Sequence, residues 1–146
     1  MPASPMIDLG ERLAALGRAL GEREAEHEAG LERARVCAEA LRGQVWDALQ
    51  RFHAAAAAAG APHLRIDVST VRVDDKHLRA VEFDLLRGRH KAIVVVKARG
   101  EVTLVGPFHL GKDEGPCRSF PAEVTAELKD GLGSFLERFV QEAAAP

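Results

Sequence analysis

The chain contains few of the residues on which several classes of site and scaffold depend. Tyrosine is absent, aromatic residues make up 5% of the 146 positions, and Cys37 and Cys117 are the two cysteines. Two cysteines are too few for the disulfide framework of a small secreted domain. The opening sequence MPASPMIDLGER also lacks the basic and apolar regions of a secretory signal. We therefore expect a reducing, cytoplasmic location.

Long apolar runs and a strong charge of one sign are missing as well. The longest uncharged run, residues 54–62, is mostly alanine and is much shorter than the roughly 18 apolar residues that a membrane-spanning helix needs. The net charge of -2 gives no general attraction to nucleic acid or to an anionic membrane. We expect no membrane partner, and any binding of nucleic acid would need a local basic patch.

The first part of the chain has the pattern of one long amphipathic helix. Residues 7–59 contain no proline, and their large apolar residues recur at helical spacing. We predict a helix over residues 7–60, after a disordered N-terminus of residues 1–6. Two heptad-like stripes follow each other along it, separated by a stutter with Glu24 and His27 at the junction. The residues expected to form a contact between helices are Leu13, Leu16, Leu20, Leu31, Leu41 and Val45.

Two arrangements can bury these stripes. A continuous helix would extend for about 80 Å at 1.5 Å per residue, which is more than the remainder of the chain can cover. Either the continuous helix self-associates, or a break at Gly21 or Gly30 folds its first half back on the second. Each glycine costs only about 1 kcal/mol relative to alanine, and strong helix formers surround both. The sequence therefore favours a continuous helix in a homodimer or higher oligomer.

After Pro62 the apolar period changes from helical to alternating. Residues 61–146 are predicted to form a four-stranded antiparallel meander and a C-terminal helix packed on the sheet. Pro121 is expected to begin that helix, with Ser119 as its N-cap. The chain as a whole is then predicted to be an α+β protein. The expected strands cover residues 64–68, 81–85, 92–96 and 101–105, with turns at 74–77 and 87–90.

Residues 106–121, GPFHLGKDEGPCRSFP, are predicted to be a loop and form the most distinctive segment of the chain. Its candidate binding residues are His109, Lys112, Cys117 and Arg118. A catalytic interpretation makes Cys117 a nucleophile activated by Arg118 or by the N-terminus of the final helix, with His109 as the base. No family signature surrounds the cysteine, however, and a crossover rich in glycine and proline uses such residues for its turns. We assign no catalytic residue.

Neither a metal site nor a cofactor site is expected. The histidines His77, His90 and His109 and the thiol of Cys117 lack the spacing of any common metal-binding motif. The chain also contains neither of the glycine patterns that cradle phosphates.

A basic turn is the second candidate for binding. Arg87, Arg89, Lys91 and Arg99 lie in the most positive part of the chain and can contact phosphates. No aromatic residue alternates with them to stack on bases. The pattern therefore favours a solvated turn over a nucleic-acid interface.

These observations favour a non-catalytic, homo-oligomeric interaction or adaptor protein. The long helix would mediate self-association, and the sheet domain would bind an unidentified protein partner. Two alternatives remain open at this stage. One is a small nucleic-acid-associated protein that uses the turn from Arg87 to Lys91 together with Arg99. The other is an enzyme with a site formed by Cys117 and His109.

Overall fold

The computed structural model describes residues 5–74, 79–111 and 115–145. A long N-terminal helix, an antiparallel sheet and a C-terminal helix on that sheet follow one another, which confirms the predicted α+β class. Of the N-terminus expected to be disordered, residues 1–4 lie outside the described residues, and Pro5 and Met6 begin the first helix. The elements are α1 (Pro5–Ala58), β1 (Asp67–Val68), β2 (Arg72–Val73), β3 (Ala80–Arg87), β4 (His90–Lys97), β5 (Glu101–His109), β6 (Cys117–Pro121) and α2 (Thr125–Ala143).

Helix α1 is continuous, as predicted, and passes through both Gly21 and Gly30 without a break. Its C-terminal end is closed by Gly60, which has a φ of +98° in the left-handed region that glycine adopts readily. The N–H of Ala61 donates to the carbonyl of Ala56 at 2.8 Å, the long-range bond of a Schellman cap. The helix therefore ends where its sequence signals predict.

The sheet has six strands in place of the four expected, and all of its neighbouring strands are antiparallel. One added strand is β2: the predicted first strand, residues 64–68, is shortened to β1, and β2 follows it and also pairs with β3. Ser69 lies between them, and its hydroxyl accepts a hydrogen bond from the Asp84 N–H at 2.8 Å. This bond replaces a regular ladder bond, so the edge of the sheet is interrupted at that point.

The other added strand lies in the segment predicted to be a loop. Strand β5 continues to His109, and β6 pairs with β5 in a further hairpin. The hydroxyls of Thr103 and Ser119 are hydrogen-bonded across the two strands at 2.9 Å. The predicted helix start at Pro121 with Ser119 as N-cap is therefore wrong, because both residues belong to β6, and α2 begins at Thr125.

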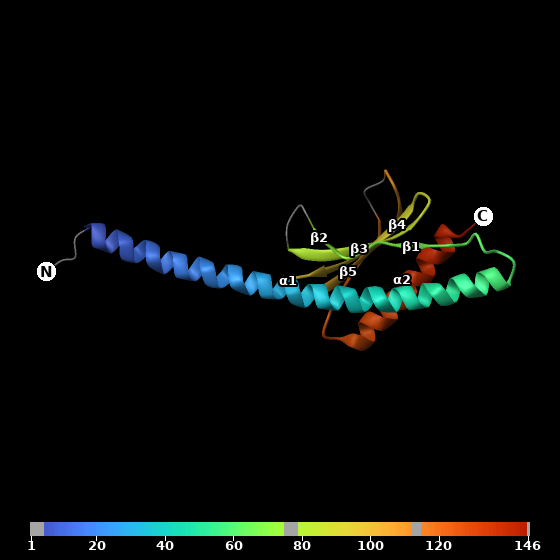
Figure 1. Cartoon of the computed structure of the whole chain (residues 1–146), viewed down its shortest axis with the longest axis horizontal. Helices are drawn as coiled ribbons and strands as arrows, with labels where there is room; N and C mark the ends of the chain where they lie inside the picture. Colours follow the sequence, from blue (N-terminus) through green and yellow to red (C-terminus); the bar gives the residue numbers. More distant parts are fainter. Residues whose placement is uncertain (1–4, 75–78, 112–114, 146) are drawn as a thin grey trace.

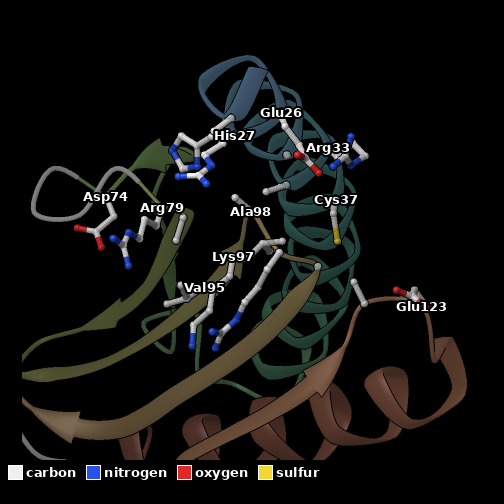
Figure 2. A pocket seen from close by; sticks show the side chains of 18 residues that line it. Glu26, His27, Arg33, Cys37, Asp74, Arg79, Val95, Lys97, Ala98 and Glu123 are labelled. Carbon is white, nitrogen blue, oxygen red and sulfur yellow. The ribbon is translucent and has the colours of Figure 1, made fainter. Parts of the chain in front are cut away.

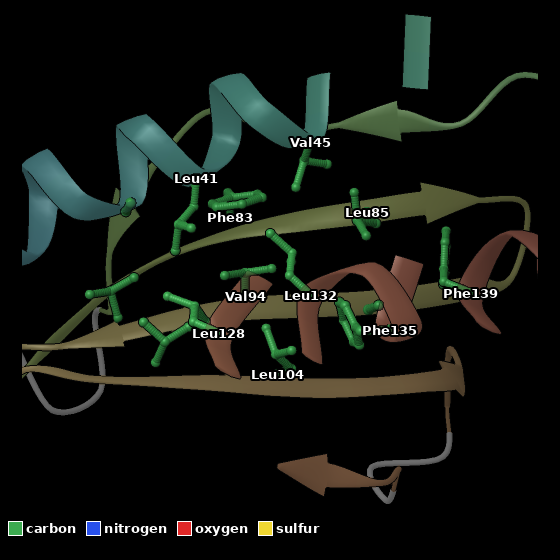
Figure 3. Packing of buried hydrophobic residues seen from close by; sticks show 14 of the residues in the cluster. Leu41, Val45, Phe83, Leu85, Val94, Leu104, Leu128, Leu132, Phe135 and Phe139 are labelled. Carbon is green, nitrogen blue, oxygen red and sulfur yellow. The ribbon is translucent and has the colours of Figure 1, made fainter. Parts of the chain in front are cut away.

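Both helices pack on the same face of the sheet. Phe83, Val94 and Leu104 lie side by side on β3, β4 and β5, and together with Val45 of α1 and Phe139 of α2 they form one apolar cluster (Figure 3). Alternate residues of each strand point into this cluster, as expected for a sheet with one covered face. The core is therefore a single layer between the sheet and its two helices.

The opposite face of the sheet is charged, and no element among the described residues packs on it. Arg72 donates to Glu82 at 2.9 Å and to Asp84 at 2.8 Å, and the Lys91 Nζ lies 3.7 Å from Asp84. Asp84 is 7% exposed, so these partners offset the cost of burying its carboxylate. We call this surface the open face.

Candidate functional site

The N-terminal part of α1 extends beyond the sheet. Residues 5–29, which we call the overhang, form a helical segment about 37 Å long at 1.5 Å per residue, and its N-terminal part projects away from the sheet (Figure 1). Four leucines along it form a stripe that no described residue covers, with exposed fractions of 51–59%. Such a row of exposed leucines is unusual for a surface that meets only water. The leucines of this stripe are Leu9, Leu13, Leu16 and Leu20.

The exposed leucines lie on the same side of α1 as the residues that face the sheet. Leu9 and Val45 are 36 residues apart, and so are Leu13 and Leu49. This separation equals ten turns at 3.6 residues per turn, so each pair points in the same direction. Val45 and Leu49 are buried in the core. The two apolar stripes, separated by Glu24 and His27, thus lie on the same side of the helix, and the sheet covers the second of them from near Gly30.

Gly30 marks the point where the sheet begins to cover α1. A Cβ placed on Gly30 would lie 2.8 Å from the carbonyl oxygen of Ala98, in the turn between β4 and β5. The backbone of the helix therefore approaches the backbone of this turn more closely than any other residue type allows. Gly30 was one of the two predicted positions for a break in the helix, whereas in the structure it allows close packing of the helix on the turn.

A second stripe, made of small residues, runs beside the exposed leucines. Gly10, Ala14, Gly17 and Gly21 repeat at steps of four, three and four residues, the same steps as the leucines. A Cβ added to Gly10, Gly17 or Gly21 would meet no described atom within 4 Å. This side of the overhang therefore has room for another backbone to approach.

The structure divides the residues that were predicted to mediate self-association. Leu13, Leu16 and Leu20 are exposed on the overhang, and Leu31 is half-buried. Leu41 and Val45 are buried at 6% and 0% exposure against the protein's own sheet. Assigning Leu41 and Val45 to a contact between copies was therefore wrong, because the domain itself covers the second half of the helix.

A hollow of about 1100 Å³ lies where the overhang leaves the sheet (Figure 2). We call it the notch. Lys97 and Arg99 on its wall both contact Glu101, at 3.2 and 3.3 Å. The hydrogen bond from Lys97 and the nearby positive charges lower the pKa of the Glu101 carboxyl. The other charged residues of its lining are Arg23, Glu26, Arg33, Asp74, Arg79 and Glu123.

The notch offers little support for catalysis. Cys37 lies on its wall, but burial raises the pKa of this thiol, which disfavours the reactive thiolate. His27 also contributes to the lining, yet it is ten residues from Cys37 on the same helix, or about 15 Å along the axis. The two side chains therefore do not form a nucleophile and base pair.

Cys117 and His109 are also separated by the fold. Cys117 pairs with Val105 on the open face, whereas His109 pairs with His90 on the face that the helices cover. His109 is four residues beyond Val105 on the same strand, about 13 Å away at 3.3 Å per residue. The predicted Cys117–His109 site is therefore wrong, since residues on opposite faces cannot share a proton directly.

The remaining residues of the predicted loop site do not join them. Lys112 lies outside the described residues. The guanidinium of Arg118 lies 4.8 Å from the ring centroid of Phe120, a cation–π contact that holds it against its own strand.

The predicted basic turn does not form one surface. Arg87 donates to the carbonyl of Ala143 at 3.0 Å and so binds the C-terminal end of α2. Lys91 faces Asp84 on the open face, and Arg89 is exposed. Arg99 lies at the far end of β4, roughly 25 Å from Arg87 at 3.3 Å per residue. The structure therefore separates the residues expected to contact phosphates together.

Two of the histidines considered for metal binding do meet. The rings of His90 and His109 lie 4.5 Å apart, edge to face, because their strands pair at this position. No group of three or more metal-ligating side chains occurs among residues 5–74, 79–111 and 115–145. His77 lies outside the described residues.

The notch could not be predicted from the sequence, because its walls come from segments that are far apart in the chain: α1, the β2–β3 connection and the β4–β5 turn.

No helix formed by the described residues combines the length and apolarity needed to cross a bilayer. No protein-family model, curated protein or solved structure matches this chain.

Proposed function

We propose that this is a non-catalytic assembly protein that self-associates through the overhang and presents the sheet domain to another macromolecule. The observation that carries the proposal is the stripe of four leucines, each more than half exposed on a helix that has left its own domain. Covering each leucine contributes about 1 kcal/mol, and a pair of copies covers eight of them. The gain is modest for each residue, so the association should be reversible and concentration-dependent.

Helix energetics also favour a partner for the overhang. Most helical stability in proteins comes from packing of an apolar face, and no described residue packs on the leucines of the overhang. Gly10, Gly17 and Gly21 lower the intrinsic stability further, by about 1 kcal/mol each relative to alanine. A second helix packed on the leucine stripe supplies the packing that the sheet does not.

The open face is the surface that we assign to the other macromolecule. It combines the charged group around Asp84 with half-buried Ile93, Val95 and Val105 on the two central strands. Polar groups around a small apolar centre are typical of a protein-binding surface. In an assembly held by the overhang, this face stays accessible on every copy.

Solution mass tests the self-association. Sedimentation equilibrium of the full chain between about 1 and 300 μM should show a dimer or higher oligomer. The double variant Leu13→Glu/Leu16→Glu should be monomeric, because it places charges on the stripe. Val36→Glu provides the matched control: Val36 is also on α1 and is 63% exposed, but it is outside the stripe. A monomeric wild-type chain across this range, or a double variant with unchanged mass, contradicts the proposal.

A further inference from the structure

We infer that the overhang pairs with the overhang of a second copy, antiparallel about a two-fold axis, so that Leu9 faces the partner's Leu20 and Leu13 faces the partner's Leu16. This inference rests on the proposed function and names the partner and its orientation. Four features of the overhang support it: the leucine spacing, the position of the sheet, the distribution of charge and the stripe of small residues.

The leucine spacing allows every leucine to be used in both copies. The steps from Leu9 to Leu20 are four, three and four residues, which read the same in both directions. A two-fold axis between Leu13 and Leu16 therefore brings all four leucines of one copy against all four of the other. Such a self-complementary surface is what a two-fold dimer requires.

The position of the sheet decides between the two possible orientations. The exposed leucines point to the same side of α1 as Val45 and Leu49, which the sheet covers. In a parallel pair the partner helix lies on the leucine side of α1 and continues past Gly30. Both sheet domains would then have to occupy the same space as the two helices. In an antiparallel pair the domains lie at opposite ends. The first residue of α1, Pro5, then falls opposite the partner's Glu24, before the sheet begins.

The charge of the overhang favours the same orientation. Glu22, Glu24, Glu26 and Glu28 are concentrated in its last two turns, and a parallel pair would place these carboxylates beside their own copies. An antiparallel pair places them beside the N-terminal end of the partner helix, where the helix dipole is positive. The contact between the four carboxylates and their own copies is thereby avoided, and Asp8 at the N-terminal end is paired with Arg12 at 3.7 Å.

The small residues leave one flank of the leucine contact unobstructed. In the pairing described, Gly10 and Gly17 flank the leucines on one side and meet the partner's Gly17 and Gly10. Because neither glycine has a side chain or a described atom near its Cβ position, no bulky group at these flanking positions obstructs the contact between the leucines.

Distances between spin labels test the orientation. The background is the full chain with Cys37→Ala and Cys117→Ser, and a nitroxide is attached at Glu28→Cys or at Glu11→Cys. In the antiparallel pair the two Glu28 positions are about 40 Å apart along the axis, and the two Glu11 positions about 10 Å, at 1.5 Å per residue. The Glu11 label is the matched control, because its separation is short in either orientation.

The possible outcomes distinguish a failure of the antiparallel orientation from a failure of self-association. A separation of about 40 Å at Glu28 together with a short one at Glu11 supports antiparallel pairing. Short separations at both sites, in a sample with the mass of a dimer, overturn the antiparallel arrangement and leave self-association intact. An absence of dipolar coupling at both sites, in a sample with the mass of a monomer, overturns both proposals.

Discussion

The half of α1 that follows Gly30 and the half that precedes it have apolar residues at the same helical positions, yet their surroundings differ. Leu41 and Val45 are buried against the sheet, whereas Leu13 and Leu16 are more than half exposed. A helical apolar period therefore predicts that a face needs to be covered, and it does not say what covers it. Here the same pattern meets the protein's own sheet at one end and a proposed second copy at the other.

The largest expected effect comes from truncating one leucine in each half. Leu41→Ala should lower the free energy of unfolding by about 2–5 kcal/mol, because it leaves a cavity in a packed core. Leu13→Ala should change the stability of the monomeric domain by less than about 0.5 kcal/mol, while weakening association. Urea unfolding followed by the fluorescence of Trp46, at a protein concentration that dissociates the oligomer, gives the free energy of unfolding of each variant. Equal losses from the two variants would contradict the comparison.

A smaller effect is expected from adding one methyl group at the boundary. Gly30→Ala should lower the free energy of unfolding by about 1–3 kcal/mol, because the new Cβ meets the Ala98 carbonyl. The matched control is Gly43→Ala, on the same helix but with open space around its Cβ position. It should raise stability by about 1 kcal/mol through helix propensity. Thermal unfolding of both variants checks the opposite signs, and a stabilising Gly30→Ala would show that the sheet does not approach the helix there.

The smallest effect is a pH dependence confined to the packed half. The Ile66 N–H donates to the Nε2 of His53 at 2.9 Å, so that nitrogen must be unprotonated. Burial and the positive charge of Arg65 lower the pKa of His53 from 6.5, although Asp67 acts in the opposite direction. In the pH window between the lowered pKa and 6.5 the unfolded chain binds more protons than the folded one. Stability should therefore fall as the pH decreases below 6.5.

His53→Gln is the control for this prediction, because glutamine does not titrate and its amide oxygen can still accept from Ile66. The difference in unfolding free energy between wild type and His53→Gln should change as the pH falls below 6.5 and stay constant above it. A difference that is constant from pH 5 to pH 8 would show that His53 does not contribute to the pH dependence.

Much of the fold could be predicted because its signals are local. The period of the leucines, the absence of proline and the Gly60 cap define α1, and alternating residues define the central strands. Strand β6 could not be predicted in this way. Its formation depends on pairing with β5, including the hydrogen bond between the hydroxyls of Ser119 and Thr103, which are 16 residues apart in the sequence. A proline and an N-cap type in that segment indicated a helix start more strongly than a strand.

The candidate site was predictable in part for the same reason. Leu13, Leu16 and Leu20 followed from their spacing, whereas burial of Leu41 and Val45 depends on where the sheet packs. The proposed Cys117–His109 pair failed because side chains on opposite faces of a sheet cannot meet, and the face of each residue is set by register. Register depends on pairing with other strands, which one strand's sequence does not reveal.

Because α1 is unbroken through Gly21 and Gly30, the direction of the leucines around the helix axis is fixed relative to the sheet. Each residue inserted between Leu20 and Gly30 would turn the leucines by about 100° around the axis and move them by about 1.5 Å. Seven added residues would nearly restore the original direction at a greater distance, whereas two would turn the leucines almost to the opposite side. The number of residues between Leu20 and Gly30 thus sets both the reach of the leucines and the direction in which they face relative to the sheet.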